Sequence, residues 1–259
     1  LANGSLDEFV THPDFDMVKG DASQAYENLL KKADRYILYV RPDTFIVIDD
    51  LESANEKGAN YEWWLNGMSG TISVYEDGTG ARLTKGAAAL DAQIQYPEKV
   101  NYQYSNIFSG ADLAEVARPA AYQNSDTHQR IWFETEKLPK TKMVTTLDVH
   151  RSSENPQYIA SVSHGDYIEL SFEKGTKAYV KTTDAETVDT GSIQFRGAAV
   201  LVNDASVMLV SGTYLKAEET VLVDADKNLS AAMGRGLVNL SAPDDTTVTL
   251  GYAGCDSLL

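Results

Sequence analysis

The chain has 259 residues, of which 43% are hydrophobic and 23% are charged, a composition typical of a soluble globular protein with one large or two modest domains. Its formal net charge is −16, so neither nucleic acid nor a membrane is an expected partner. The single cysteine, Cys255, cannot form an internal disulfide, and its place beside the C-terminus argues against thiol catalysis.

The first pattern along the chain predicts one helix followed by two strands. Asp21 is a plausible N-cap, and the apolar residues after it recur at helical spacing, which predicts about three turns of helix over residues 22–33. The segments "RYILYV" (35–40) and "TFIVIDDL" (44–51) are rich in β-formers and lack clean alternation. We therefore expect both strands in the middle of a sheet, buried on both faces.

Strands without helix follow. "NYEWWLNGM" (60–68) reads as a strand, and "TISVYEDGTGARLTKG" (71–86) reads as a hairpin with Asp77 and Gly78 in its turn. Further strands recur at roughly 8–12-residue spacing, which predicts an antiparallel sandwich. The expected fold class is all-β, an antiparallel β-sandwich with one short helix. We expect the sandwich over residues 1–183 and a smaller C-terminal β-module over residues 184–259, because the segment around residues 182–191 is polar and rich in turns.

One segment is long, polar and poor in strand formers. "SGADLAEVARPAAYQNSD" lies between Phe108 and His128 and is expected to form a loop. Long loops in compact domains are often functional.

Two groups of histidines give weak signals. "HPDFD" places His12, Asp14 and Asp16 on one face of an extended strand, as in a metal corner, but the more frequent outcome for such a pattern is a solvated edge. No metal site is therefore expected. His150, at a strand end, and His164, in a turn, are expected on the surface.

The aromatic residues suggest a sugar-contacting face. Trp63 and Trp64 are adjacent in a strand, so one ring should enter the core and the other should lie outward, where indoles stack on sugar rings. The alternative is that neighbouring elements cover both rings. His128 and Arg130 share a strand face, with Trp132 beyond them. Such a face can contact sugars, but it is more often a half-buried sheet face with polar residues outward.

Motifs for several other enzyme classes are absent from the sequence. It contains no G-x-x-x-x-G-K-[ST] or G-x-G-x-x-G loop for nucleotides and no G-x-S-x-G nucleophile elbow.

A combination of motifs near the N-terminus resembles the C-terminal β-sandwich region of the heparinase II/III-like polysaccharide lyases. In that family a Gly-Asp-Ala-Ser/Thr-x-Ala-Tyr segment precedes a strand headed by Arg, and strands with "PD" followed by acidic residues and with "y-W-l" come next. The likeness covers roughly residues 5–180 and is weaker beyond. The matching positions are Gly20, Asp21, Ala22, Ser23, Ala25, Tyr26, Arg35, Pro42, Asp43, Val47, Asp49, Asp50, Tyr61, Trp64 and Leu65.

The resemblance implies an activity for the parent protein. In this family a base removes the proton α to a uronic-acid carboxylate, and the glycosidic oxygen leaves by β-elimination. The tyrosine, asparagine and histidine for this step come from an N-terminal helical toroid, and a further histidine and metal ligands lie in early strands of the sandwich. This sequence contains neither a toroid nor a His-x-His-x-Asp strand, and Asn66 stands where the family has a histidine. We therefore expect the chain alone to be inactive, with no catalytic residue and no cofactor of its own.

The sequence thus predicts a supersandwich-like domain that forms one wall of a glycan cleft in a secreted bacterial polysaccharide lyase, located extracellularly or in the periplasm. The expected partners are an acidic polysaccharide, such as a glycosaminoglycan or alginate, and the helical toroid of the same protein. The alternative is a non-catalytic carbohydrate-binding or structural β-sandwich module. The candidate substrate-binding residues are Trp63, Trp64, Asn66, His128 and Arg130.

Overall fold

The computed structural model describes residues 3–105 and 128–251. Within these ranges the chain forms three antiparallel sheets and one short 3-10 helix, η1 (Ser23–Tyr26), which confirms the all-β class. No helix in this part of the chain has the length and apolar character that a membrane-crossing helix needs. The expected loop between Phe108 and His128, and Cys255, lie outside the described residues.

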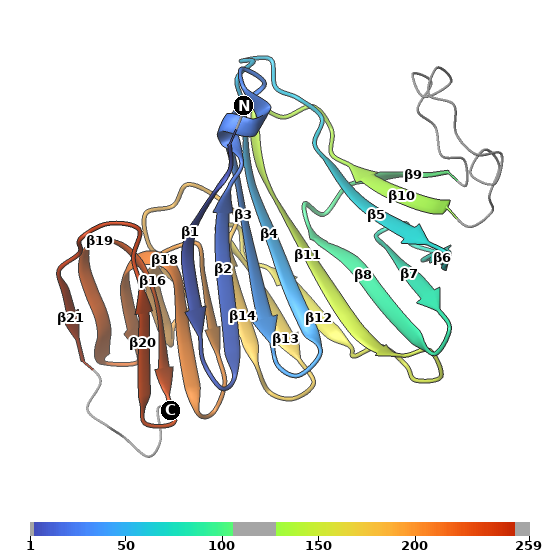
Figure 1. The fold of residues 1–259 in the computed structure, drawn as a ribbon. Coiled ribbons are helices and arrows are strands. Elements are labelled where there is room, and N and C mark those ends of the chain that lie inside the picture. Colours follow the sequence, from blue (N-terminus) through green and yellow to red (C-terminus); the bar gives the residue numbers. More distant parts are fainter. Residues whose placement is uncertain (1–2, 106–127, 252–259) are drawn as a thin grey trace.

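The first sheet is the central layer, and its strands lie side by side in Figure 1. In spatial order it consists of β1 (Ser5–Thr11), β2 (Phe15–Asp21), β3 (Leu30–Val40), β4 (Thr44–Ser53), β11 (Lys140–Arg151), β8 (Ala88–Tyr96), β7 (Gly80–Lys85) and β6 (Thr71–Val74).

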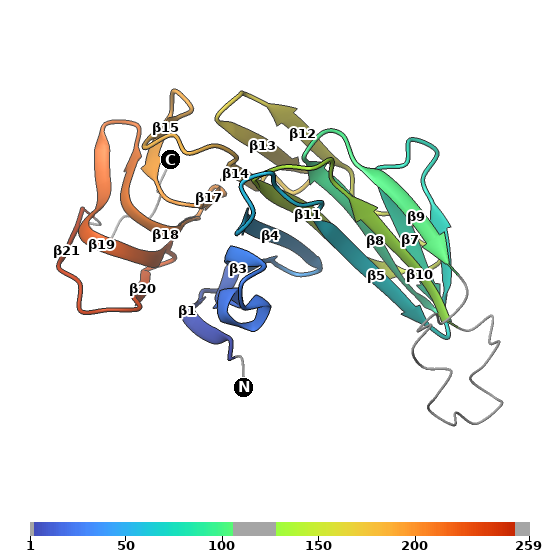
Figure 2. The same cartoon turned by 90° about the horizontal axis from the view of Figure 1, so that it is seen from above.

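The other two sheets pack on opposite faces of the first. The second sheet contains β5 (Glu62–Met68), β10 (His128–Glu134) and β9 (Asn101–Ser105), in that order. The third contains β12 (Ile159–Ser163), β13 (Tyr167–Phe172), β14 (Lys177–Lys181), β17 (Ala199–Val202), β18 (Ser206–Ala217), β16 (Ile193–Arg196) and β15 (Val188–Asp189), while β19 (Thr220–Gly234) pairs with β18, β20 (Leu237–Ser241) and β21 (Val248–Leu250). Figure 2 shows β5, β9 and β10 at one end of the molecule and β19 to β21 at the other.

Alternation along the strands explains this layering. In β11, Val144 enters one core with Ile48 of β4 and Leu170 of β13, between the first and third sheets. The next residue back, Met143, points the other way and enters a core with Phe133 of the second sheet. Burial of both faces makes the first sheet the middle layer.

The expected helix over residues 22–33 is wrong. Only η1 is helical, and β3 already begins at Leu30, which pairs with Ser53 of β4. Ala33 is buried, and its N–H donates a hydrogen bond to Ser23 Oγ at 2.9 Å instead of to a carbonyl one helical turn earlier. Pairing with β2 on one side and β4 on the other satisfies more of the backbone than an isolated helix would, and tertiary pairing therefore overrides the local pattern.

Other expectations on the strands are confirmed. β3 and β4 lie in the middle of the first sheet, and β6 and β7 form the expected hairpin, with Gly78 at φ +71° in its turn. β4 is mostly buried, but Ile37 of β3 is 37% exposed, so β3 is not buried on both faces as expected. The division at residue 183 stays a prediction; the pairing of β14 with β17 crosses it.

Candidate functional site

Three of the five candidate side chains share the outer face of the second sheet with a fourth residue, Trp132. In the antiparallel pair of β5 and β10, Trp64 lies opposite Trp132, and Asn66 lies opposite Arg130. Directly opposed residues point to the same side of a sheet. We call Trp64, Asn66, Arg130 and Trp132 the aromatic platform.

The platform has a defined geometry. The rings of Trp64 and Trp132 stack with centroids 4.5 Å apart and planes 14° apart. The Arg130 guanidinium carbon lies 5.4 Å from the Trp64 ring centroid and 5.7 Å from that of Trp132, within the range of cation–π attraction. Glu62 accepts a hydrogen bond from Trp64 Nε1 at 2.9 Å, which fixes the indole in place.

The platform is accessible from solvent. Trp64 is 39% exposed, and over residues 3–105 and 128–251 β5 is an edge strand of its sheet, with no further strand beyond Trp64. Asn66 is exposed, and Arg130 and Trp132 are half-buried. Apolar ring faces beside an amide and a planar cation are the groups that bind sugar rings and their carboxylate or sulfate substituents.

The structure does not bring all five candidate residues together. Trp63 is 6% exposed and packs against Phe133 in the core below the sheet, with ring centroids 6.3 Å apart. It therefore lies on the opposite face from Trp64, as the strand period predicted. His128 begins β10 opposite Met68, and its side chain lies outside the described residues.

Sequence reasoning did not place Trp132 among the candidates. The signal was present, since Trp132 follows Arg130 by two residues and therefore shares its strand face. The stack with Trp64 could not be read from the sequence, because it depends on the register between strands that lie far apart along the chain.

A second polar cluster lies on the face of the first sheet that is turned toward β12 of the third sheet. Asp91 of β8 accepts hydrogen bonds from Arg82 Nε at 3.0 Å, from the Tyr75 hydroxyl, and from His150 Nε2 at 2.5 Å. The side chain of His150 is only 8% exposed, so the expectation that it lies on the surface is wrong. Asp148 and Asp91 pair across the strands and keep the cluster acidic.

The pKa values in this cluster follow from its contacts. Burial by itself raises the pKa of Asp91, but the hydrogen bonds from Arg82, His150 and Tyr75 outweigh it and hold the pKa below its ordinary value. Burial lowers the pKa of His150, and the hydrogen bonds to Asp91 and to the Arg151 carbonyl more than reverse this. The cluster is saturated internally, which suits a structural role better than proton exchange with a substrate.

A cavity of about 430 Å³ lies beside this cluster. Amide, hydroxyl and carboxylate groups line it, among them those of Gln93, Gln95, Thr146, Asp148 and Gln157. Several are already engaged, since Asp148 accepts from the Gln157 N–H at 2.9 Å and Gln95 donates to Thr146 Oγ1 at 2.9 Å.

The possible metal corner near the N-terminus is occupied by protein contacts. His12 is 2% exposed, not at a solvated edge as expected, and its Nε2 lies 3.2 Å from the Gly234 carbonyl oxygen. Asp14 accepts from Arg235 at 2.7 Å, and Asp16 accepts from Arg41 at 2.5 Å. Over residues 3–105 and 128–251, no group of three or more His, Cys, Asp or Glu side chains is arranged to hold a metal ion.

No family model and no curated protein matches the sequence. Among solved structures, the chain is similar to heparan sulfate lyase HepC from Pedobacter heparinus, with 13% identity and a TM-score of 0.46 over 66% of this chain and 26% of that one. A mutant of the same lyase gives 12% identity and a TM-score of 0.47 over 69% of this chain and 28% of that one. Heparinase III gives 16% identity and a TM-score of 0.45 over 70% of this chain and 27% of that one. The chain thus spans about a quarter of the length of these structures.

Proposed function

We propose that the chain is the β-sandwich part of a polysaccharide lyase and that its aromatic platform forms part of the wall of a cleft for an acidic polysaccharide. The observation that carries this proposal is the stack of Trp64 on Trp132 with the Arg130 guanidinium over both rings. The platform matches the chemistry of a uronate polymer, whose rings have apolar faces and whose carboxylates bind planar cations.

The charges around the platform limit what this chain does alone. Glu62 and Glu134 lie on the same face as Trp64, and their carboxylates repel an anionic polymer. Among the described residues of this face, Arg130 is the cation that opposes them, in a chain with net charge −16. A tight cleft therefore needs cations from a second domain, and the motif resemblance supports a helical toroid in that place.

Catalysis in this proposal belongs to the partner domain. The toroid would supply the base that removes the proton α to the uronate carboxylate, and the glycosidic oxygen would leave by β-elimination. Asn66 can donate a hydrogen bond to a carboxylate or hydroxyl, but an amide exchanges no proton near neutral pH, so its role is binding. Acidic polysaccharides of this class lie outside cells, which supports an extracellular or periplasmic location.

A second candidate function is a carbohydrate-binding module without catalysis. It is favoured by the fact that all four platform residues belong to this one chain and need no partner to assemble. Both functions require that the platform bind glycan.

Affinity electrophoresis in gels that contain heparan sulfate, chondroitin sulfate or alginate tests this requirement. We expect at least one polymer to retard the chain, and we expect Trp64→Ala, Trp132→Ala and Arg130→Gln to lose the retardation. Tyr26→Ala is the control, because Tyr26 is 48% exposed but lies in η1, outside the second sheet. Equal retardation of all variants, or none for the parent chain with any of the polymers, contradicts the proposal.

A further inference from the structure

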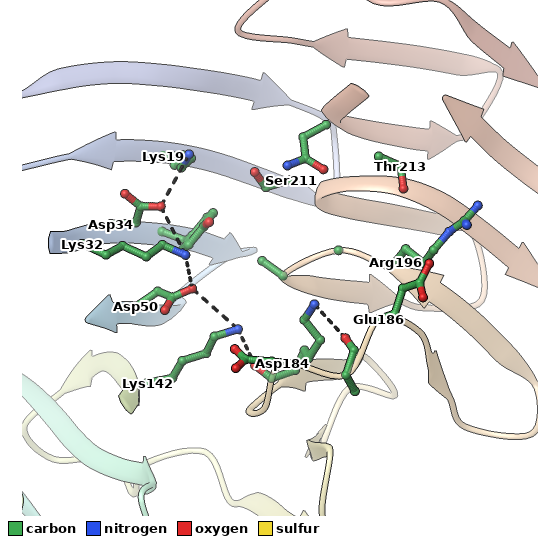
Figure 3. Close-up of a pocket in the computed structure, with 16 residues that line it drawn as sticks. Lys19, Lys32, Asp34, Asp50, Lys142, Asp184, Glu186, Arg196, Ser211 and Thr213 are labelled. Atoms are coloured by element: carbon green, nitrogen blue, oxygen red, sulfur yellow. Dashed lines mark hydrogen bonds and ion pairs between the residues drawn. The ribbon is translucent and has the colours of Figure 1, made fainter. Parts of the chain in front are cut away.

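A cavity with a charged lining lies between the first and third sheets, away from the platform. Its volume is about 550 Å³, and Figure 3 shows the charged side chains that surround it. Five cationic side chains reach it from five different strands: Lys19 of β2, Lys32 of β3, Lys142 of β11, Lys181 of β14 and Arg196 of β16. We call this cavity the lysine pocket.

Along one wall of the lysine pocket, charges alternate in sign. Asp34 lies 3.6 Å from Lys19 Nζ and 3.7 Å from Lys32 Nζ, and Asp50 accepts a hydrogen bond from Lys32 at 2.7 Å. Lys142 Nζ follows, at 3.8 Å from the same Asp50 carboxylate. Asp50 is thus shared between two ammonium groups, and its closer contact is with Lys32 (Figure 3).

The ammonium groups of Lys142 and Lys181 are held by backbone carbonyls. Lys142 Nζ donates to the Lys181 carbonyl at 2.9 Å, and Lys181 Nζ donates to the Ala185 carbonyl at 3.1 Å. A carbonyl accepts the hydrogen bond but does not neutralise the charge. Burial accordingly lowers the pKa of Lys142 to about 8 and lowers the pKa of Lys181.

Arg196 faces these lysines from the opposite wall. Its guanidinium carbon lies 4.9 Å from the ring centroid of Tyr214, which orients the plane of the group. Its Nε is buried and has no hydrogen-bond acceptor among the residues that the structure describes. A buried donor of this kind is costly to leave unsatisfied.

The carboxylates nearest this wall belong to the loop after β14. Asp184 and Glu186 line the pocket but are exposed to solvent, and Asp184 forms an ion pair with Lys140, which lies outside the lining. The lining therefore contains five cations and four carboxylates, in a chain whose net charge is −16. Among the residues that the structure describes, Lys181 and Arg196 form no ion pair with a carboxylate, and Lys142 has only the Asp50 contact at 3.8 Å.

We propose that the lysine pocket binds a small oxyanion, a sulfate, phosphate or carboxylate group, through Lys142, Lys181 and Arg196. Such a group supplies a negative charge beside Lys181, adds to the Asp50 contact of Lys142 at 3.8 Å, and provides an acceptor for the Arg196 guanidinium. Charge-assisted hydrogen bonds of this type are stronger than neutral ones, and a guanidinium presents two parallel donors to an oxyanion. This site is separate from the aromatic platform and stands whether or not the platform binds glycan.

The oxyanion has two possible sources, a free inorganic ion and a substituent on a sugar. Isothermal titration of the full chain with sodium sulfate, sodium phosphate and sodium glucuronate, each against sodium chloride of equal ionic strength, distinguishes them. We expect saturable binding of one anion per chain, beyond the effect of chloride. Binding of the inorganic ions alone assigns the site to a free ion, and tighter binding of glucuronate assigns it to a sugar carboxylate. Absence of saturable binding with all three overturns the proposal.

Matched variants locate the binding. We expect Lys142→Met and Lys181→Met each to weaken anion binding by roughly tenfold, the loss of one charge-assisted contact. Lys31→Met is the control, because Lys31 neighbours Lys32 in β3 but pairs with Glu52 at 3.3 Å outside the pocket. Circular dichroism verifies that each variant is folded, and Arg196→Gln replaces either lysine variant that is not. Equal affinity in the folded pocket variants and in the control contradicts the assignment, whereas Trp64→Ala should leave anion affinity unchanged.

Discussion

The imidazole of His150 and the carboxylate of Asp91 form a hydrogen-bonded ion pair, with His150 Nε2 2.5 Å from Asp91 Oδ2. The other ring nitrogen, Nδ1, lies 2.8 Å from the Arg151 carbonyl oxygen. Neither acceptor has a proton to give, so both contacts are hydrogen bonds only when both ring nitrogens carry a proton, and the arrangement favours the charged imidazole. β8 and β11, which carry the two residues, are therefore joined by a side-chain contact in addition to their backbone ladder.

This contact predicts a pH-dependent stability. The folded-state pKa of His150 lies above its ordinary value of 6.5, so its contribution is complete below pH 6.5 and is lost as the pH rises through the folded-state pKa. The folded-state pKa of Asp91 lies below 3.8, so its contribution is present above pH 3.8 and is lost on acidification. We expect His150→Gln to lower the free energy of unfolding at pH 5.5 by about 1–3 kcal/mol, with a smaller loss at pH 8.5.

Urea unfolding of the parent chain and of His150→Gln at several pH values measures this difference. Tyr75 and Arg82, which also contact Asp91, are present in both the parent and the variant. A difference between the proteins that is independent of pH contradicts the ion pair.

The adjacent tryptophans Trp63 and Trp64 should separate stability from binding. Trp63 is buried against Phe133, so Trp63→Ala should cost about 3–5 kcal/mol of unfolding free energy. Trp64 is partly exposed, and Trp64→Ala should cost about 1 kcal/mol, the size of an aromatic pair interaction, while it removes glycan retardation. Thermal melts and affinity electrophoresis on both variants check this, and a larger loss of stability for Trp64→Ala than for Trp63→Ala would show that the two roles are reversed.

Lys142 should destabilise the folded protein in the absence of an anion. Its folded-state pKa of about 8 is below the ordinary 10.5, so folding at neutral pH carries the cost of burying a charge, which is relieved as the pH rises from 8 to 10.5. We expect Lys142→Met to raise the free energy of unfolding at pH 7 by on the order of 1–3 kcal/mol. Loss of the hydrogen bond to the Lys181 carbonyl reduces this gain.

Denaturation of Lys142→Met and the parent at pH 7 and pH 10 is the measurement. The difference in unfolding free energy between the variant and the parent should be smaller at pH 10 than at pH 7. A difference that grows with pH means that Lys142 is stabilised in its charged form. Lys31→Met, on an exposed side chain, should show no such trend.

The chain alone should not cleave uronate polymers. Of the histidines whose side chains the structure describes, His12 and His150 are buried and hydrogen-bonded, and His164 stacks on Tyr167 with centroids 4.7 Å apart. None lies on the aromatic platform, where Asn66 offers no proton to exchange. The ultraviolet absorbance of unsaturated uronate products should stay flat with heparan sulfate, chondroitin sulfate and alginate. A steady rise that Asn66→Ala or Trp64→Ala abolishes would place the chemistry in this domain.

Local sequence was sufficient for features that depend on strand period. The two-residue period alone places Trp63 and Trp64 on opposite faces of β5, and the apolar run from Phe45 to Ile48 requires an interior position for β4. The Asp77–Gly78 pair marks the turn between β6 and β7, because glycine adopts positive φ without a steric cost. These features follow from interactions within a few residues of the chain.

Tertiary structure decided what depends on partners distant in sequence. Residues 30–33 join β3 because pairing on both sides gains more free energy than a short helix does. The stack of Trp64 on Trp132 follows from the register of β5 against β10, and no local pattern encodes that register. Lys142, Lys181 and Arg196 meet only because two sheets pack face to face, and the burial that sets the pKa of Lys142 exists only in that packing.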